Sequence, residues 1–355
     1  MKNVLYACSY APVEIVSALG LTPTWLLPDG APQNADQYIH SLTCPYVRQL
    51  CTILMAGDVG SLNAIVLPNS CDGMRRLADV VRANRPDLPL VFMDVPRKSD
   101  PASIDLFSLR LRQFADELAS IFSRASLDDD ALWRSIAEYN DVRLGMQELF
   151  MQLRTATPIV SGSEVYQLSR EAVTTHIDDF LPSLRRFLAH MHDRKRMMAT
   201  RQAPRLMLFG NILTDPEIVR VIEDAGAVVA SMDHCFGERA FDRPVPTDID
   251  DPYTALSHRY LTRSTCPRME GLETRINDIV SLAEEAGVDG VIYCSVTHCD
   301  NFLYDAPTII RHLKEHDIPV LQLTHDGEWN SPGQVETRIE AFIETIENRK
   351  VSRYA

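Results

Sequence analysis

Cysteine is the residue type in this chain with the most potential for chemistry. Eight cysteines occur, at positions 8, 44, 51, 71, 235, 266, 294 and 299. Cys44 stands directly before a proline, and Cys71 and Cys299 each stand before an aspartate, residues that favour the first turn of a helix. A helix N-terminus offers free backbone N–H groups and a positive dipole end, which favour a thiolate. These three cysteines are therefore candidate metal ligands or reactive thiols.

The plainer interpretation of any one cysteine is a small buried apolar residue. Cys51 and Cys294 fit that interpretation, because they fall on an apolar helix stripe and inside a strand. Structural zinc sites usually contain a close pair such as C-x2-C, and the sequence has none. A glycine-rich phosphate loop and an H-E-x-x-H helix are also absent from the sequence. The residues alone leave a metal site and a reactive-thiol site both open.

The elements that must position these cysteines follow from the apolar pattern. Short runs rich in Val, Ile and Leu alternate with amphipathic helical stretches, which is typical of parallel strands joined by crossover helices. Strands are expected at residues 4–8, 24–27, 64–68, 90–94, 205–209, 227–232, 290–293 and 320–323. From 101 to about 198 leucines and aromatic residues recur at helical spacing instead. We predict an α/β protein with two Rossmann-like or flavodoxin-like domains, residues 1–100 and 201–355, and a helical region at 101–200.

This arrangement places two of the cysteines at sheet edges. Cys71 and Cys299 each follow a predicted strand, so both belong at the carboxyl rim of a parallel sheet, where ligands bind in open α/β folds. With Cys44 they could meet in a cleft between the domains. The halves also echo each other, because a Cys-Pro pair precedes Cys71 by 27 residues and another, at Cys266, precedes Cys299 by 33.

Length and charge limit the class of protein. A chain of 355 residues with 45% hydrophobic residues should divide into two cores. The formal net charge of −14 is the wrong sign for binding nucleic acid or an anionic membrane surface. The sequence has neither a signal peptide nor an apolar run of the roughly 18 residues that a membrane span needs. We expect a cytoplasmic protein, whose cysteines are not paired in structural disulfides.

Six segments, in this order, resemble a known family. They are APVEIVSALGLTP, SLTCPYVRQL, VLPNSCDGMRR, LMLFGNILTDPEIVRVIEDAGA, GVIYCSVTHCD and GQVETRIEAFIE. They resemble the 2-hydroxyacyl-CoA dehydratase D-component family, which also includes benzoyl-CoA reductase subunits and double-cubane-cluster proteins. The resemblance implies that Cys44, Cys71 and Cys299 supply three thiolates to a [4Fe–4S] cluster, leaving one iron open.

The resemblance also implies a function. The chain would be the iron–sulfur subunit of a 2-hydroxyacyl-CoA dehydratase, which eliminates water from an acyl-CoA through a ketyl radical after an ATP-dependent activator protein donates one electron. Its partner would be a homologous second subunit, in a heterodimer, or a second copy of itself. The alternatives are a double-cubane or benzoyl-CoA-type reductase subunit and a non-catalytic electron-transfer protein that only holds a cluster.

Two polar residues near the first strand are candidate catalytic residues by the same resemblance. Ser9 could hydrogen-bond a ligand of the open iron, and Glu14 could move protons or hold a dipole end. The plainer interpretation is that Ser9 caps the helix that opens at Pro12 and that Glu14 complements its dipole.

The remaining candidates have weaker support. Cys235 and Cys266 could be extra ligands of a double-cubane [8Fe–9S] cluster, or inert thiols. We favour inert thiols, because double-cubane proteins tend, by resemblance, to be longer at the N-terminus. Four arginines could bind CoA phosphates or simply be solvated: Arg48, Arg75, Arg76 and Arg239.

Overall fold

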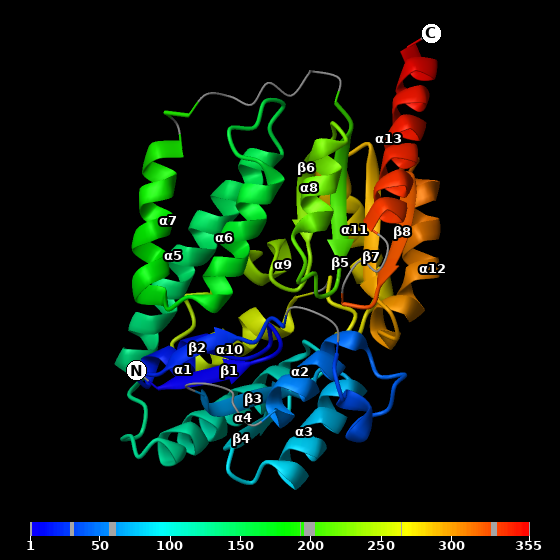
Figure 1. Cartoon of the computed structure of the whole chain (residues 1–355). Coiled ribbons are helices and arrows are strands. Elements are labelled where there is room, and N and C mark those ends of the chain that lie inside the picture. Colours follow the sequence, from blue (N-terminus) through cyan, green and yellow to red (C-terminus); the bar gives the residue numbers. More distant parts are fainter. Residues whose placement is uncertain are drawn as a thin grey trace.

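Two parallel four-stranded sheets form the framework of the chain (Figure 1). The computed structural model describes residues 2–28, 32–56, 62–191, 193–194, 203–263, 265–327 and 332–354. The first sheet has the order β2-β1-β3-β4, from β1 (Asn3–Tyr6), β2 (Thr22–Trp25), β3 (Leu62–Pro68) and β4 (Leu90–Met93). The second has the order β6-β5-β7-β8, from β5 (Arg205–Gly210), β6 (Val228–Asp233), β7 (Gly290–Val296) and β8 (Val320–His325). The predicted α/β class with two Rossmann-like sheets is confirmed, and the two sheets share one strand order.

Helices connect and cover the strands. The strands of the first sheet are connected by α1 (Val13–Ala18), the 3-10 helix η1 (Ala35–Gln37), α2 (Pro45–Met55) and α3 (Asp72–Asn84). The second is followed or joined by α8 (Glu217–Asp224), α9 (Glu238–Phe241), α10 (Pro252–Leu261), α11 (Leu272–Glu285), α12 (Asp300–Glu315) and α13 (Pro332–Tyr354). Between β4 and β5 the chain forms α4 (Pro101–Ile121), α5 (Asp129–Leu153), α6 (Gly162–Thr174) and α7 (Ile177–Met191). Figure 1 shows α5, α6 and α7, in green, standing above the blue first sheet and beside the second.

The apolar core differs from the two separate cores that chain length predicts. One cluster of buried side chains runs from Val4 to Ile346 and takes in both sheets. It is continuous because α6 contacts both β2 and β6, and because α10, although it follows β6, packs against α4. A second, smaller cluster covers the other face of the second sheet, with Met207 and Phe209 from β5. The helical region therefore joins the two sheets into one body.

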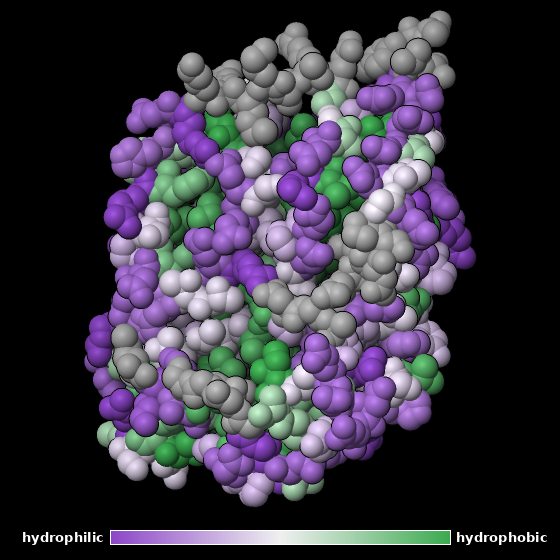
Figure 2. All heavy atoms as spheres, in the orientation of Figure 1, coloured by the Kyte–Doolittle hydropathy of each residue, from purple (hydrophilic) through white to green (hydrophobic). Residues whose placement is uncertain are grey.

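The face of the molecule drawn in Figure 2 is largely polar. On the face drawn in Figure 2, hydrophilic residues cover most of the helices, and apolar residues show mainly in patches between them. Across the described ranges no helix combines the length and the apolar character that a membrane crossing requires.

Candidate functional site

The three predicted cysteines each occupy the N-cap of a helix. Cys44 precedes α2, Cys71 precedes α3 and Cys299 precedes α12. The Sγ atom of Cys71 accepts a hydrogen bond of 3.4 Å from the Met74 amide in the first turn of α3. Cys71 follows β3 and Cys299 follows β7, which hold equivalent places in the two sheets. In both sheets this place adjoins the point where the strand order reverses, where ligands bind in such folds.

A single cavity brings the three cysteines together. This cysteine cavity, of about 450 Å³, is lined by Cys44, Cys71 and Cys299. Its other walls come from the loops after β3 and β4 and from the residues that begin α12. The carboxyl rims of the two sheets therefore face each other across the cavity, as the placement of Cys299 required.

The thiols of the cavity are less acidic than their helix positions predict. Burial raises the pKa of Cys44 well above its usual value, and the nearby Cys299 and Cys71 sulfurs raise that pKa further. Burial likewise raises the pKa of Cys71 to about 12, and it raises the pKa of Cys299. The prediction that the helix N-terminus favours a thiolate at Cys44 is wrong for the free thiol, because desolvation outweighs the backbone N–H groups. A bound metal cation would reverse the balance, since a coordinating thiol loses its proton.

The aspartates that follow Cys71 and Cys299 are not the caps of their helices. Asp72 and Asp300 are the first helical residues, and the cysteines before them hold the cap positions. The Asp72 side chain is 72% exposed and pairs at 3.4 Å with Arg76. Both aspartates therefore lie in the first turn of a helix, as the sequence predicts, and the cysteine before each one is the N-cap residue.

A second set of three cysteines, Cys8, Cys235 and Cys266, adjoins the first set. Burial raises the pKa of Cys235 well above its usual value, and the neighbouring thiols of Cys266, Cys8 and Cys299 add to the shift. Burial also raises the pKa of Cys8, and Cys266 contributes to that shift. Cys8 influences Cys71 in turn, so the two sets adjoin. Six cysteines from separate segments thus gather in one region, which the favoured interpretation of Cys235 and Cys266 as isolated inert thiols did not anticipate.

Two buried arginines hold the Cys266 segment between the first sheet and α12. Arg268 donates to the carbonyl oxygens of Val95 and Pro96, after β4, with 2.6 Å to Pro96. Arg275 donates to the Met269 carbonyl at 2.9 Å and pairs with Asp305 of α12 at 2.8 Å. The turn that carries Cys266 is thereby fixed between the first sheet and α12.

The other two cysteines confirm their predicted role in the core. Cys51 and Cys294 are fully buried, whereas the six clustered cysteines are partly exposed. Burial alone raises the pKa of Cys51 to about 11. These two residues serve as internal comparisons for the clustered six.

The thiols around the cavity do not converge on one point. Among the described residues, no three His, Cys, Asp or Glu side chains converge closely enough to hold one metal ion. In a [4Fe–4S] cubane each iron takes its own ligand, so the sulfurs are spread around the cluster. Cys44, Cys71 and Cys299 lie around one cavity in this way, and thiolates are the usual ligands of iron–sulfur clusters.

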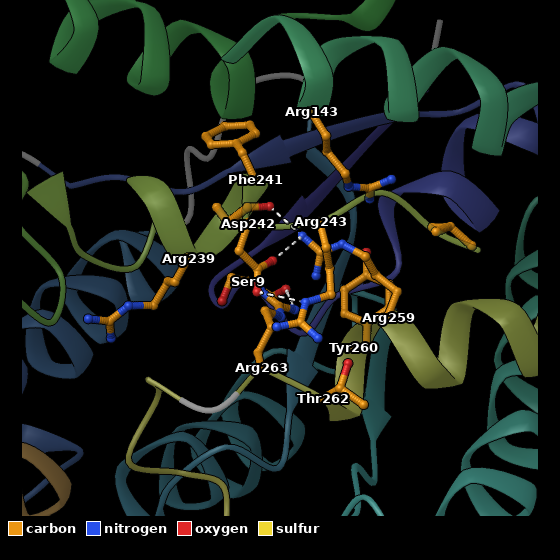
Figure 3. Close-up of polar contacts among 12 residues, drawn as sticks. Ser9, Arg143, Arg239, Phe241, Asp242, Arg243, Arg259, Tyr260, Thr262 and Arg263 are labelled. Atoms are coloured by element: carbon orange, nitrogen blue, oxygen red, sulfur yellow. Dashed lines mark hydrogen bonds and ion pairs between the residues drawn. The ribbon is translucent and has the colours of Figure 1, made fainter. Parts of the chain in front are cut away.

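Ser9 lies in a different cavity from the three cysteines. Ser9 lines a narrow cavity of about 60 Å³ together with Arg143, Arg259, Tyr260 and Arg263, which we name the arginine pocket. Helix α1 has no side-chain cap, so Ser9 does not cap it. Figure 3 shows Arg259 and Arg263 beside Ser9, whereas the Arg239 side chain extends away from them.

Glu14 is fully buried in an ion pair. Its carboxylate pairs with Arg143 of α5 and accepts a hydrogen bond of 2.7 Å from the Tyr260 hydroxyl. Burial by itself raises the pKa of Glu14, but the charge and hydrogen bonds of Arg143 outweigh it and lower that pKa. Glu14 therefore holds α1, α5 and α10 together as an anion, and a role in proton transfer stays a prediction.

The arginines considered for CoA occupy unlike environments. Arg75 lines the cysteine cavity and donates to Asn69 at 2.5 Å, while Arg48 pairs with Asp36 at 2.7 Å. Arg76 is exposed, and Arg239 is buried in a pair with Asp233 at 2.6 Å. Only Arg75, among these four, lies where it could meet a ligand of the cysteine cavity.

Fold and site define a class: an α/β protein whose two parallel sheets face each other across a cavity rich in cysteine. The family model described as 2-hydroxyglutaryl-CoA dehydratase, D-component, matches residues 8–346. The chain therefore belongs to this family, as the six sequence segments predicted.

Relatives extend over nearly the whole chain. The (R)-2-hydroxyglutaryl-CoA dehydratase subunit beta of Acidaminococcus fermentans is 23% identical, over 95% of this chain and 90% of the relative. A subunit of the benzoyl-CoA reductase of Thauera aromatica is 22% identical, over 97% and 91%. The (R)-phenyllactyl-CoA dehydratase beta subunit of Clostridium sporogenes is 19% identical, over 95% and 90%. The chain is thus similar to enzyme subunits of two reaction types, dehydration and reduction.

Proposed function

We propose that this chain is the iron–sulfur subunit of a 2-hydroxyacyl-CoA dehydratase, with a [4Fe–4S] cluster held by Cys44, Cys71 and Cys299. The observation that carries the proposal is the convergence of these three helix-capping thiols on one cavity between the two sheets. When bound, such a cluster with one open iron supplies a single electron at low potential to a substrate carbonyl. In this reaction type the reduced thioester, a ketyl radical, expels the neighbouring hydroxyl group.

The residues of the protein itself would bind the substrate, orient it and enclose it. Arg75 and Arg97 line the cysteine cavity and would attract an anionic substrate or its phosphates. Backbone N–H groups at the starts of α2, α3 and α12 offset part of the effect of burial on the pKa values of the cysteines, and they would stabilise thiolates bound to a metal. The relatives that are named as beta subunits support a homologous partner subunit, and one-electron chemistry of this kind requires a donor, for which we propose an ATP-dependent activator protein.

A second candidate is a reductase with a double-cubane [8Fe–9S] cluster. The specific observation that favours it is the second set of thiols, Cys8, Cys235 and Cys266, adjoining the first. Three thiolates on each side could hold one cubane each. The similarity to a subunit of a benzoyl-CoA reductase is compatible with reduction as the reaction.

Anaerobic purification followed by iron and sulfide analysis tests the proposal. We expect a brown protein that oxygen bleaches, with about four irons for one cubane and about eight for a double one. Replacing Cys299 with Ser should lower the iron content, while the matched variant Cys294→Ser, on the preceding strand, should keep it. A colourless anaerobic preparation with stoichiometric zinc would contradict the cluster.

Activity assays separate the functional classes. With the partner subunit, the activator and ATP present, a dehydratase converts a 2-hydroxyacyl-CoA to the enoyl-CoA, whereas a reductase consumes reducing equivalents without releasing water from the substrate. A chain that carries the cluster yet supports neither reaction would be an electron-transfer protein.

A further inference from the structure

The arginine pocket holds hydrogen-bond donors that lack acceptors. Arg259 and Arg263 are each 2% exposed, and both line the pocket. Within the described part of the chain, Nε and Nη1 of Arg259 and Nε of Arg263 have no hydrogen-bond partner. A buried charged donor without a partner is costly, so such groups in a cavity mark a place for an acceptor.

The remaining contacts of these arginines fix their positions. Arg259 donates from Nη2 to the Ala240 carbonyl at 2.6 Å, and Arg263 donates from Nη2 to the Ser9 carbonyl at 2.5 Å. The Arg263 guanidinium also lies over the Tyr260 ring, 4.9 Å from its centroid. Both guanidinium groups are therefore oriented before any ligand arrives (Figure 3).

Positive charge exceeds negative charge around the pocket. Arg143 is neutralised by Glu14, and Asp242 lies 3.3 Å from Arg259 but also 3.3 Å from the exposed Arg243. No carboxylate pairs with Arg263 within the described residues. Burial and the Arg143 cation lower the pKa of Arg259 to about 9, which reflects the uncompensated charge. Three buried guanidinium groups thus share two carboxylates.

We propose that the arginine pocket binds the carboxylate group of a small molecule. A single negative charge matches the surplus, and planar guanidinium groups present paired N–H donors that fit a planar carboxylate. The volume of about 60 Å³ admits a group of this size and excludes a nucleotide. Ser9, in the pocket wall, follows Cys8 directly in the sequence. The site does not depend on the iron–sulfur proposal, since every residue in it is present without a cluster.

Acetate and acetamide are matched probes, because they share a shape and differ in charge. Isothermal titration calorimetry on the anaerobically purified protein, at constant ionic strength set with sodium chloride, should detect acetate with a dissociation constant of about 1 mM. Acetamide should give no detectable binding. Acetate should also raise the melting temperature of the protein.

The variants Arg259→Met and Arg263→Met should each weaken acetate binding by about tenfold or more and lose the acetate-dependent rise in melting temperature. The control Arg185→Met removes an exposed arginine that lies outside the pocket and pairs with Asp141, and it should bind acetate as the wild type does. Iron content should stay unchanged in all three, which separates this test from that of the cluster. Equal responses to acetate and acetamide, or wild-type acetate binding by both pocket variants, would overturn the proposal.

Discussion

The six-cysteine region and the arginine pocket meet at the turn that follows β1, and they differ in charge. Cys8, on one side of the turn, belongs to a set of neutral thiols whose pKa values are raised by burial and by one another. Ser9, on the other side, lines a pocket with surplus positive charge. We propose a metal cluster for the first region and an anion for the second, although Cys8 and Ser9 are consecutive in the sequence.

The largest expected effect is a loss of iron on substitution of a cysteine of the second set. If Cys266 binds iron, Cys266→Ser should remove about half of roughly eight irons, because one of two cubanes loses a ligand. Cys51→Ser is the matched control, since Cys51 is fully buried in the core, and its iron content should equal that of the wild type. Iron per chain and the electron paramagnetic resonance spectrum measure the outcome. An unchanged cluster in the Cys266 variant would restrict the ligands to the first set.

The second largest effect is on stability, and it is expected at the buried pair of Glu14 and Arg143 beside the arginine pocket. Glu14→Gln should lower the free energy of unfolding by about 3–5 kcal/mol, because it leaves a buried guanidinium without its counter-charge. Asp141→Asn, at the exposed pair with Arg185, should cost less than about 1 kcal/mol. Urea denaturation measures both. A small effect at Glu14 would mean that Tyr260 or water satisfies Arg143 without the charge.

The same pair predicts a pH dependence. Because the pKa of Glu14 is lowered in the folded protein, its contribution to stability is fully present above the ordinary carboxyl pKa of about 4.5. That contribution is lost as the pH falls through the lowered value. The difference in unfolding free energy between wild type and Glu14→Gln should therefore shrink in acid, which denaturation curves at several pH values will measure.

The smallest effect is expected at the mouth of the cysteine cavity. Asp72→Asn should change stability by about 0.5 kcal/mol or less, since its carboxylate is exposed and only complements the start of α3. Iron content should not change, because the cysteine before it is the cap and the proposed ligand. Loss of iron in this variant would make Asp72 part of the metal site.

The sequence alone determined the helices and strands, and it placed Cys71 and Cys299 at the carboxyl ends of the strands. Apolar runs placed the eight strands, and Pro45 and Asp72 marked the helices that begin beside cysteines, because strand periodicity and helix-start preferences are local properties. Cys8 was placed inside a predicted strand at residues 4–8, whereas β1 ends at Tyr6, so Cys8 also follows a strand in the structure. Cys51 and Cys294 were assigned to the core for the same local reason.

Only the tertiary structure decided which side chains meet. Cys235 and Cys266 lie far from Cys8 in the sequence. The approach of Cys266 depends on the packing of α10 against α4 and on the hydrogen bond from Arg268 to the Pro96 carbonyl. The pairing of Glu14 with Arg143 joins residues 129 positions apart, which no local pattern encodes. The pKa values of the cysteine thiols could not be predicted from the sequence either. The helix N-terminus is a local feature, whereas desolvation depends on everything packed around the sulfur.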